Sequence, residues 1–183
     1  MGSALLTGSA IFYSSYQAIV LAAIMLIYPA LDKKWKFPTL KYNYPNILIW
    51  IIIIALTGIF SLSETISIKL ILTSLILTAI PEEWFFRAYI QTQLENYLKN
   101  KRVTLSNSST AISIITASLF FASIHVIVQN NIILLPAIFF PSLFFGYLFY
   151  KTQDIVLVIL THLISNIFLY WIIGNNLLSQ NAS

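Results

Sequence analysis

Three charged residues stand together in a part of the sequence that is otherwise almost entirely apolar. Glu82, Glu83 and Arg87 lie within six residues of one another, directly after the apolar run 70–80. A carboxylate costs several kcal/mol to place among hydrocarbon unless it is paired, hydrated or protonated. This cost favours a function for the acidic pair, and proton transfer is a reaction that a buried carboxylate can perform.

Helical spacing assigns different roles to the two carboxylates. Glu83 and Arg87 are four residues apart, so they share a helix face and we expect an ion pair between them. Glu82 lies about 100° further around a helix, and no cation follows it at three or four residues. Burial and the neighbouring charge of Glu83 should make Glu82 a stronger base than an exposed carboxylate, which a general base near neutral pH needs. The alternative is a buried ion pair that only holds one helix against another.

The two histidines of the chain also lie in apolar runs. His125 follows Phe121 by four residues, and Asn166 follows His162 by four. Polar groups at membrane depth tend to be functional, and His162 and Asn166 on one face would offer two donors to an oxyanion. Each of these residues could instead be a hydrogen-bonded packing residue. We expect them to gather with the acidic motif around one water molecule.

The composition is that of an integral membrane protein. The 183 residues are 58% hydrophobic and 9% charged, whereas a soluble domain carries about 25% charged residues. At about 20 apolar residues for each span, the length allows about six spans in a single domain, 1–183. The absence of cysteine excludes disulfides and thiolate chemistry. The net charge is +4, but the cations cluster in loops between apolar runs, so we predict no nucleic-acid partner.

Apolar runs predict an all-α, polytopic membrane bundle with the catalytic site inside it. The predicted spans are residues 10–31, 46–62, 68–98, 111–128, 132–149 and 155–173. The third is longer than a bilayer requires, and we expect Pro81 to kink it. Pro136 and Pro141 predict a bent fifth helix, and Gly174 predicts the end of the sixth. With these limits, His125 would lie about 10 Å further from the cytoplasmic face than Glu82.

Cation placement predicts the orientation. The N-terminus lacks the basic segment of a cleaved signal peptide, so we expect the first run to be a retained span. If this span runs from outside to inside, both termini are outside and eight of nine loop cations are cytoplasmic, namely Lys33, Lys34, Lys36, Lys41, Lys99, Lys101, Arg102 and Lys151. In the alternative, the third segment enters the membrane and returns to the same side. Every later loop would then change sides, and the cations would no longer gather on the cytoplasmic side.

The sequence contains three motifs in the order Glu82-Glu83-x-x-x-Arg87, Phe121-x-x-x-His125 and His162-x-x-x-Asn166. These motifs resemble those of the CPBP family, which is the Abi or type II CAAX prenyl protease group of intramembrane endopeptidases. The resemblance covers a motif-bearing core of about residues 68–173.

The resemblance implies a role for each motif residue. Glu82 and His125 would activate a water molecule for attack on a peptide carbonyl. His162 and Asn166 would stabilise the oxyanion, and Phe121 would pack the site. Glu83 and Arg87 would support Glu82.

The resemblance also leaves a metal-free and a metal-dependent mechanism open. A zinc site would need about three protein ligands and one open position, and these ligands would be Glu82, His125 and His162. The sequence has no HExxH pair on one helix that would favour a metal. We therefore predict no cofactor, with zinc as the alternative.

We predict an intramembrane endopeptidase of the bacterial cytoplasmic membrane. Its partners would be the lipid bilayer and a membrane-anchored protein or peptide, such as a CAAX-like tail, a C-terminal sorting tail or a peptide precursor. The alternative is a non-catalytic immunity or binding protein for a bacteriocin-like peptide, although a binder would not need the complete polar set. An ion or proton transporter is a third reading, and it lacks the paired half-repeats of many transporters. The residues do not specify an oligomeric state.

Overall fold

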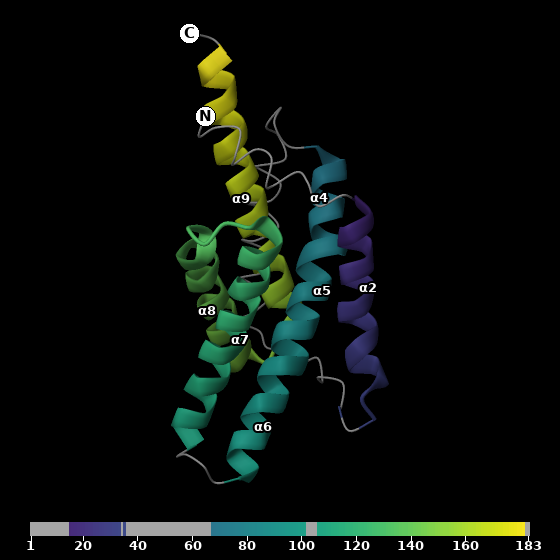
Figure 1. The fold of residues 1–183 in the computed structure, drawn as a ribbon, viewed down its shortest axis with the longest axis vertical. Coiled ribbons are helices and arrows are strands. Elements are labelled where there is room, and N and C mark those ends of the chain that lie inside the picture. Colours follow the sequence, from purple (N-terminus) through teal and green to yellow (C-terminus); the bar gives the residue numbers. More distant parts are fainter. Residues whose placement is uncertain (1–14, 34, 36–66, 102–105, 182–183) are drawn as a thin grey trace.

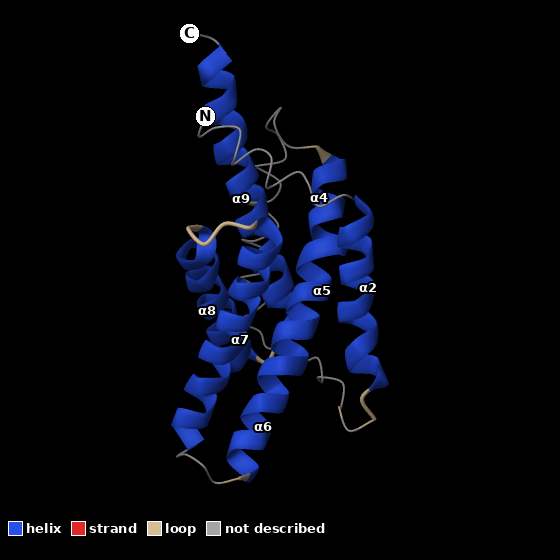
Figure 2. Cartoon of the chain, viewed as in Figure 1, coloured by secondary structure: helices blue, strands red, loops and turns tan. Residues whose placement is uncertain are grey.

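The described part of the chain is a bundle of helices. The computed structural model describes residues 15–33, 35, 67–101 and 106–181 (Figure 1). All the regular structure in these ranges is helical (Figure 2). The predicted all-α class is therefore confirmed. The second predicted span, 46–62, lies outside the described residues, and a single domain over 1–183 stays a prediction.

Three of the described helices are long and apolar enough to cross a membrane. They are α7 (Ser106–Gln129), α8 (Leu134–Thr152) and α9 (Ile155–Asn181), with Ile155–Ile172 as the apolar part of the last. The helix α2 (Ser15–Leu31) is also apolar but shorter. Large apolar side chains on these helices are exposed, as expected where a protein meets lipid, for example Ile24, Ile127 and Phe140. The protein is an integral membrane protein, as predicted.

The acidic motif lies in one continuous helical run. The run consists of α4 (Ile68–Ser74), a π-helical stretch η1 (Leu75–Ala79), α5 (Ile80–Glu83), a second π-helical stretch η2 (Trp84–Gln91) and α6 (Thr92–Asn100). The helix continues through Pro81, and wider turns lie on both sides of α5. Turns of this kind are frequent at functional sites. α2 packs along the middle of this run (Figure 1).

Two predicted helix ends are wrong. α7 begins at Ser106 instead of residue 111, and α9 continues to Asn181 beyond Gly174. In both places the sequence becomes polar, and the prediction puts the helix end at that change. A change to polar residues marks the edge of the apolar layer, whereas helical hydrogen bonds can continue past it, and one glycine costs a helix only about 1 kcal/mol.

The structure also removes the mismatch in depth between Glu82 and His125. α6 and α7 pack against each other and run in opposite directions (Figure 1). Glu82 lies 18 residues before Asn100, and His125 lies 19 residues after Ser106. Glu82 Oε1 and His125 Nε2 lie 3.7 Å apart, so the two side chains meet at the same depth. The predicted difference of about 10 Å is therefore not found.

The connections on either side of α8 are tight. Asn130, after α7, and Gln153, after α8, have positive φ values of 48° and 52°. Asp154 then begins α9, because its Oδ1 accepts the backbone N–H groups of Val156 and Leu157, both at 3.1 Å. A carboxylate is favourable at a helix N-terminus. This cap fixes the start of the helix that carries His162.

Candidate active site

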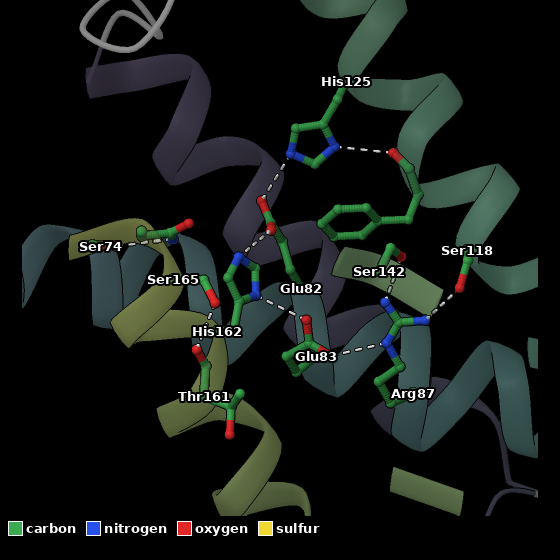
Figure 3. A network of polar contacts seen from close by, with 12 residues as sticks. Ser74, Glu82, Glu83, Arg87, Ser118, His125, Ser142, Thr161, His162 and Ser165 are labelled. Atoms are coloured by element: carbon green, nitrogen blue, oxygen red, sulfur yellow. Dashed lines mark hydrogen bonds and ion pairs between the residues drawn. The ribbon is translucent and has the colours of Figure 1, made fainter. Parts of the chain in front are cut away.

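The charged residues of the first motif and both histidines form one buried cluster (Figure 3). α5 supplies both glutamates, η2 supplies Arg87, α7 supplies His125 and α9 supplies His162. Glu83 and Arg87 are completely buried, and Glu82 and His162 are nearly so. The His125 side chain is the most exposed of the five, at 20%. The cluster is therefore most accessible from the side of α7.

The Arg87 guanidinium is held by three other groups. Its Nε donates to Glu83 Oε2 at 2.9 Å, so the ion pair expected from the sequence is present. Its Nη1 donates to Ser118 Oγ of α7 at 3.3 Å, and its Nη2 donates to Ser142 Oγ of α8 at 2.6 Å. A buried charge needs such a set of partners. These contacts connect the motif to two neighbouring helices.

Glu83 is shared between Arg87 and His162. Its second oxygen, Oε1, lies 2.8 Å from His162 Nδ1. An ionised carboxylate can only accept hydrogen bonds, so His162 Nδ1 carries a proton and donates it. The remaining ring nitrogen, Nε2, faces Glu82 Oε2 at 3.7 Å. Glu83 was expected to support Glu82, whereas its direct contact is with His162.

The backbone orients His125 in a similar way. Its Nδ1 is 2.9 Å from the Phe121 carbonyl oxygen, which can only accept, so this nitrogen donates. Its Nε2 faces Glu82 Oε1 at 3.7 Å. Each oxygen of the Glu82 carboxylate therefore faces one imidazole nitrogen, at a distance too long for a direct hydrogen bond. Glu82 Oε2 is buried and has no hydrogen-bond partner among the described residues.

Aromatic rings enclose the cluster. The Phe121 ring lies 4.4 Å from the His125 ring, and the Arg87 guanidinium carbon lies 5.7 Å from the Phe121 centroid. The Phe145 ring stacks on His162 with centroids 5.1 Å apart. Phe121 thus occupies the place expected of a packing residue. Phe145 was not singled out, because one phenylalanine in an aromatic-rich helix carries no distinguishing signal.

Asn166 makes a contact of its own with α4. It lies one helical turn beyond His162 on α9, and its Nδ2 donates to Ser74 Oγ of α4 at 3.1 Å. None of the contacts described for Glu82 or His125 involves it. The catalytic and supporting roles assigned to the motif residues stay predictions. The serines that contact the motifs, Ser74, Ser118 and Ser142, were missed because hydroxyls are common between packed membrane helices.

The residues named for the zinc alternative are Glu82, His125 and His162. Their Nε2 atoms and carboxylate oxygens face one another at 3.7 Å. Within the described ranges, however, no group of three His, Asp or Glu side chains has an arrangement that could hold a metal ion. The metal-free site stays a prediction.

Membrane helices that bury a carboxylate between two imidazoles define an intramembrane protein with a site suited to acid–base chemistry. A family model described as Type II CAAX prenyl endopeptidase Rce1-like matches residues 45–168, and the chain belongs to this family. The matched range includes all three motifs, which confirms the resemblance found in the sequence. Comparison with curated proteins and with solved structures gave no match. Membership of the family supports a CAAX-type intramembrane protease.

A first prediction concerns Gly146, which lies on α8 close to the guanidinium. A Cβ atom at this position would lie 2.9 Å from Gln91 Oε1, 3.0 Å from Ile114 Cγ2 and 3.3 Å from Arg87 Nη1. We expect Gly146→Ala to destabilise the protein by about 1–3 kcal/mol, as overpacking does. Thermal unfolding in detergent measures this loss, and an unchanged transition would contradict it. Adding Gln91→Ala removes the closest atom and should recover part of the stability.

Proposed function

We propose that the protein is a glutamate-type intramembrane endopeptidase. The observation that carries this proposal is the placement of Glu82. Both oxygens of this buried carboxylate face imidazole nitrogens at 3.7 Å, and one oxygen lacks a hydrogen-bond partner among the described residues. A water molecule at this position would find acceptors for both of its hydrogens. Polar groups that are buried normally have such partners, including ordered water.

In the proposed reaction, the Glu82 carboxylate takes a proton from the water as the water oxygen attacks the peptide carbonyl carbon. The lone pair on His125 Nε2 accepts the second hydrogen bond of the water and orients it. The carbonyl oxygen becomes an oxyanion. When the C–N bond breaks, protonated Glu82 gives its proton to the leaving amine, so the carboxylate is restored.

Oxyanion stabilisation is assigned to α9. His162 donates through Nδ1 to Glu83, so it can also donate to an oxyanion only if Nε2 carries a second proton. In this proposal Nε2 is protonated when the oxyanion forms, and the Glu83 carboxylate, 2.8 Å from Nδ1, is the neighbouring counter-charge. Asn166 supplies the second donor through its amide. Two such donors are the usual requirement for an oxyanion site.

The proposed substrate is a membrane-anchored protein or peptide with its scissile bond near the cytoplasmic face. A CAAX-like tail, a C-terminal sorting tail and a peptide precursor all fit this description. The proposed location is the bacterial cytoplasmic membrane with both termini outside. Among the described residues, no contact favours the alternative of a non-catalytic binding protein.

Cleavage by His125→Gln tests the proposal. The purified protein in lipid vesicles is supplied with a prenylated CAAX peptide, the same peptide without the prenyl group, and a sorting-tail peptide with a membrane anchor. We expect wild type to cleave at least one anchored peptide. We expect His125→Gln to cleave it about 10²-fold more slowly, since positioned proton acceptors contribute 10²–10⁴-fold.

The controls address folding and metal dependence. Gln129→Ala, at the end of the same helix, should cleave at the wild-type rate. Activity should survive a chelator, and metal analysis should find less than one bound ion for each active molecule. Full activity of His125→Gln, or no cleavage of any anchored peptide, would contradict the proposal. Loss of activity in the presence of a chelator would show that the mechanism depends on a metal.

A further inference from the structure

The hydrogen bond between Ser74 and Asn166 connects the helical run of the acidic motif to the helix of the third motif. We propose that Ser74 is a positioning residue for Asn166, and that it fixes which atom of the Asn166 amide faces the substrate. This inference rests on the proposed function, because it assigns a purpose to the Asn166 donor. Ser74 belongs to none of the three motifs.

The surroundings make this hydrogen bond selective. Ser74 is 4% exposed and is the last residue of α4 before the first π-helical stretch. The seam between this run and α9 has an apolar core of Ala79, Leu163 and Ile167. The other polar contacts described across it are those of His162 with the two glutamates. Within the described ranges, Ser74 Oγ is the hydrogen-bond partner recorded for the Asn166 side chain. The amide therefore has one polar group by which its orientation can be set.

The chemistry of the amide explains why its orientation matters. Its nitrogen carries two hydrogens, and its oxygen is an acceptor. When one hydrogen is donated to Ser74, the second N–H is held in the same plane and points in a different direction. An amide without this anchor can turn over and present its oxygen, which would repel an oxyanion instead of binding it. With Ser74 Oγ as the acceptor, the nitrogen side of the Asn166 amide is held, and its second N–H stays available to an oxyanion.

A simple packing role is the competing explanation. Serine and asparagine form hydrogen bonds between membrane helices, and such bonds stabilise association modestly. If packing were the whole role, removal of the hydroxyl would lower thermal stability and leave the turnover of folded protein unchanged. The positioning role instead predicts a loss in kcat at nearly constant KM, because an oxyanion donor acts on the transition state.

The experiment compares Ser74→Thr with Ser74→Val, which have nearly the same shape and differ in the hydroxyl group. We expect Ser74→Val, and also Ser74→Ala, to lower kcat about tenfold, which is less than the 10²–10³-fold cost of removing an oxyanion donor outright. KM should change less than twofold. Ser74→Thr should retain most of the wild-type kcat. Each rate is divided by the fraction of folded molecules, which is obtained from the thermal transition.

A matched control uses another hydroxyl on α9. Ser165 lies next to Asn166 and donates to the backbone oxygen of Thr161 at 3.0 Å (Figure 3). Because this bond is internal to the helix, Ser165→Ala should leave kcat within about twofold of wild type.

Combining the variants separates failure of the inference from failure of the proposed function. In an Asn166→Ala background, Ser74→Ala should cause no further loss of kcat, because the amide that it positions is absent. If Asn166→Ala itself leaves kcat unchanged, the oxyanion role in the proposed function is wrong. If Asn166→Ala is slow but Ser74→Ala and Ser74→Val retain full kcat, only the positioning role of Ser74 is wrong. Equal losses from Ser74→Ala in both backgrounds would also overturn it.

Discussion

Glu82→Gln is expected to slow cleavage of a membrane-anchored peptide by about 10³-fold, within the 10²–10⁴-fold that general acid–base catalysis contributes. The amide has nearly the same shape as the carboxylate but cannot take a proton from water. The measurement is kcat/KM for the peptide that wild type cleaves best. The comparison variant is Glu95→Gln, which changes a glutamate on the same helical run that pairs with Lys99. It should cleave at the wild-type rate.

The same Glu82 variant should not be less stable than wild type. Glu82 has no ion pair shorter than 3.7 Å, and its Oε2 is buried without a hydrogen-bond partner among the described residues. A buried group in this condition is a cost to folding. Glutamine keeps a polar side chain at this position but removes its charge, which is the costlier part to bury, so the thermal transition should stay or rise. Retention of more than a tenth of wild-type activity, or unfolding of the variant, would contradict this account of Glu82.

Arg87→Met is expected to destabilise the protein by about 3–5 kcal/mol, the usual cost of breaking a buried ion pair. Methionine fills much of the same space but leaves the Glu83 carboxylate, which is 0% exposed, without its cation. It also removes the donor to Ser118 and Ser142. Thermal and denaturant unfolding in detergent measure the loss. A loss below about 1 kcal/mol, the range of an exposed ion pair, would show that the cluster is hydrated.

Lys99→Met provides a matched control for Arg87→Met. Lys99 and Glu95 have the same spacing of four residues, but the Lys99 side chain is 42% exposed. We expect almost no change in stability, since exposed pairs at this spacing contribute about 0.3–0.5 kcal/mol. The contrast between the two pairs isolates the effect of burial.

The double variant Glu83→Gln with Arg87→Met separates stability from activity. Removing both charges of a buried pair is often neutral, so much of the stability lost in Arg87→Met should return. Activity should not return, because glutamine can accept the hydrogen bond from His162 Nδ1 but supplies no negative charge beside the ring, where Glu83 Oε1 lies at 2.8 Å. A stable and active double variant would show that His162 needs no carboxylate partner.

Local spacing in the sequence was sufficient to predict some contacts of the site. The ion pair between Glu83 and Arg87 follows from the four-residue repeat of a helix. The packing role of Phe121 is instead implied by the family resemblance, and its ring lies 4.4 Å from that of His125. Amino-acid composition was sufficient to predict a membrane protein, and the long apolar runs were sufficient to predict that it is helical.

Contacts between distant helices were not predictable in the same way. The sharing of Glu83 between Arg87 and His162 depends on the rotation of α9 against α5, and no local pattern encodes this rotation. The hydroxyl partners Ser118 and Ser142 are 31 and 55 residues away from Arg87. Wider π turns beside α5 also rotate the faces that a regular repeat would predict. For these reasons the neighbours of each motif became visible only in the structure.

The division of work between the adjacent glutamates has an evolutionary consequence. Glu83 is engaged by Arg87 and His162, and Arg87 in turn contacts α7 and α8. Among the described residues, Glu82 has no polar contact shorter than 3.7 Å. A lineage could therefore lose peptidase activity by one substitution at Glu82 and still inherit a sound scaffold. Relatives that became inhibitors or receptors would be expected to keep the second glutamate and the arginine, and to vary at the first glutamate.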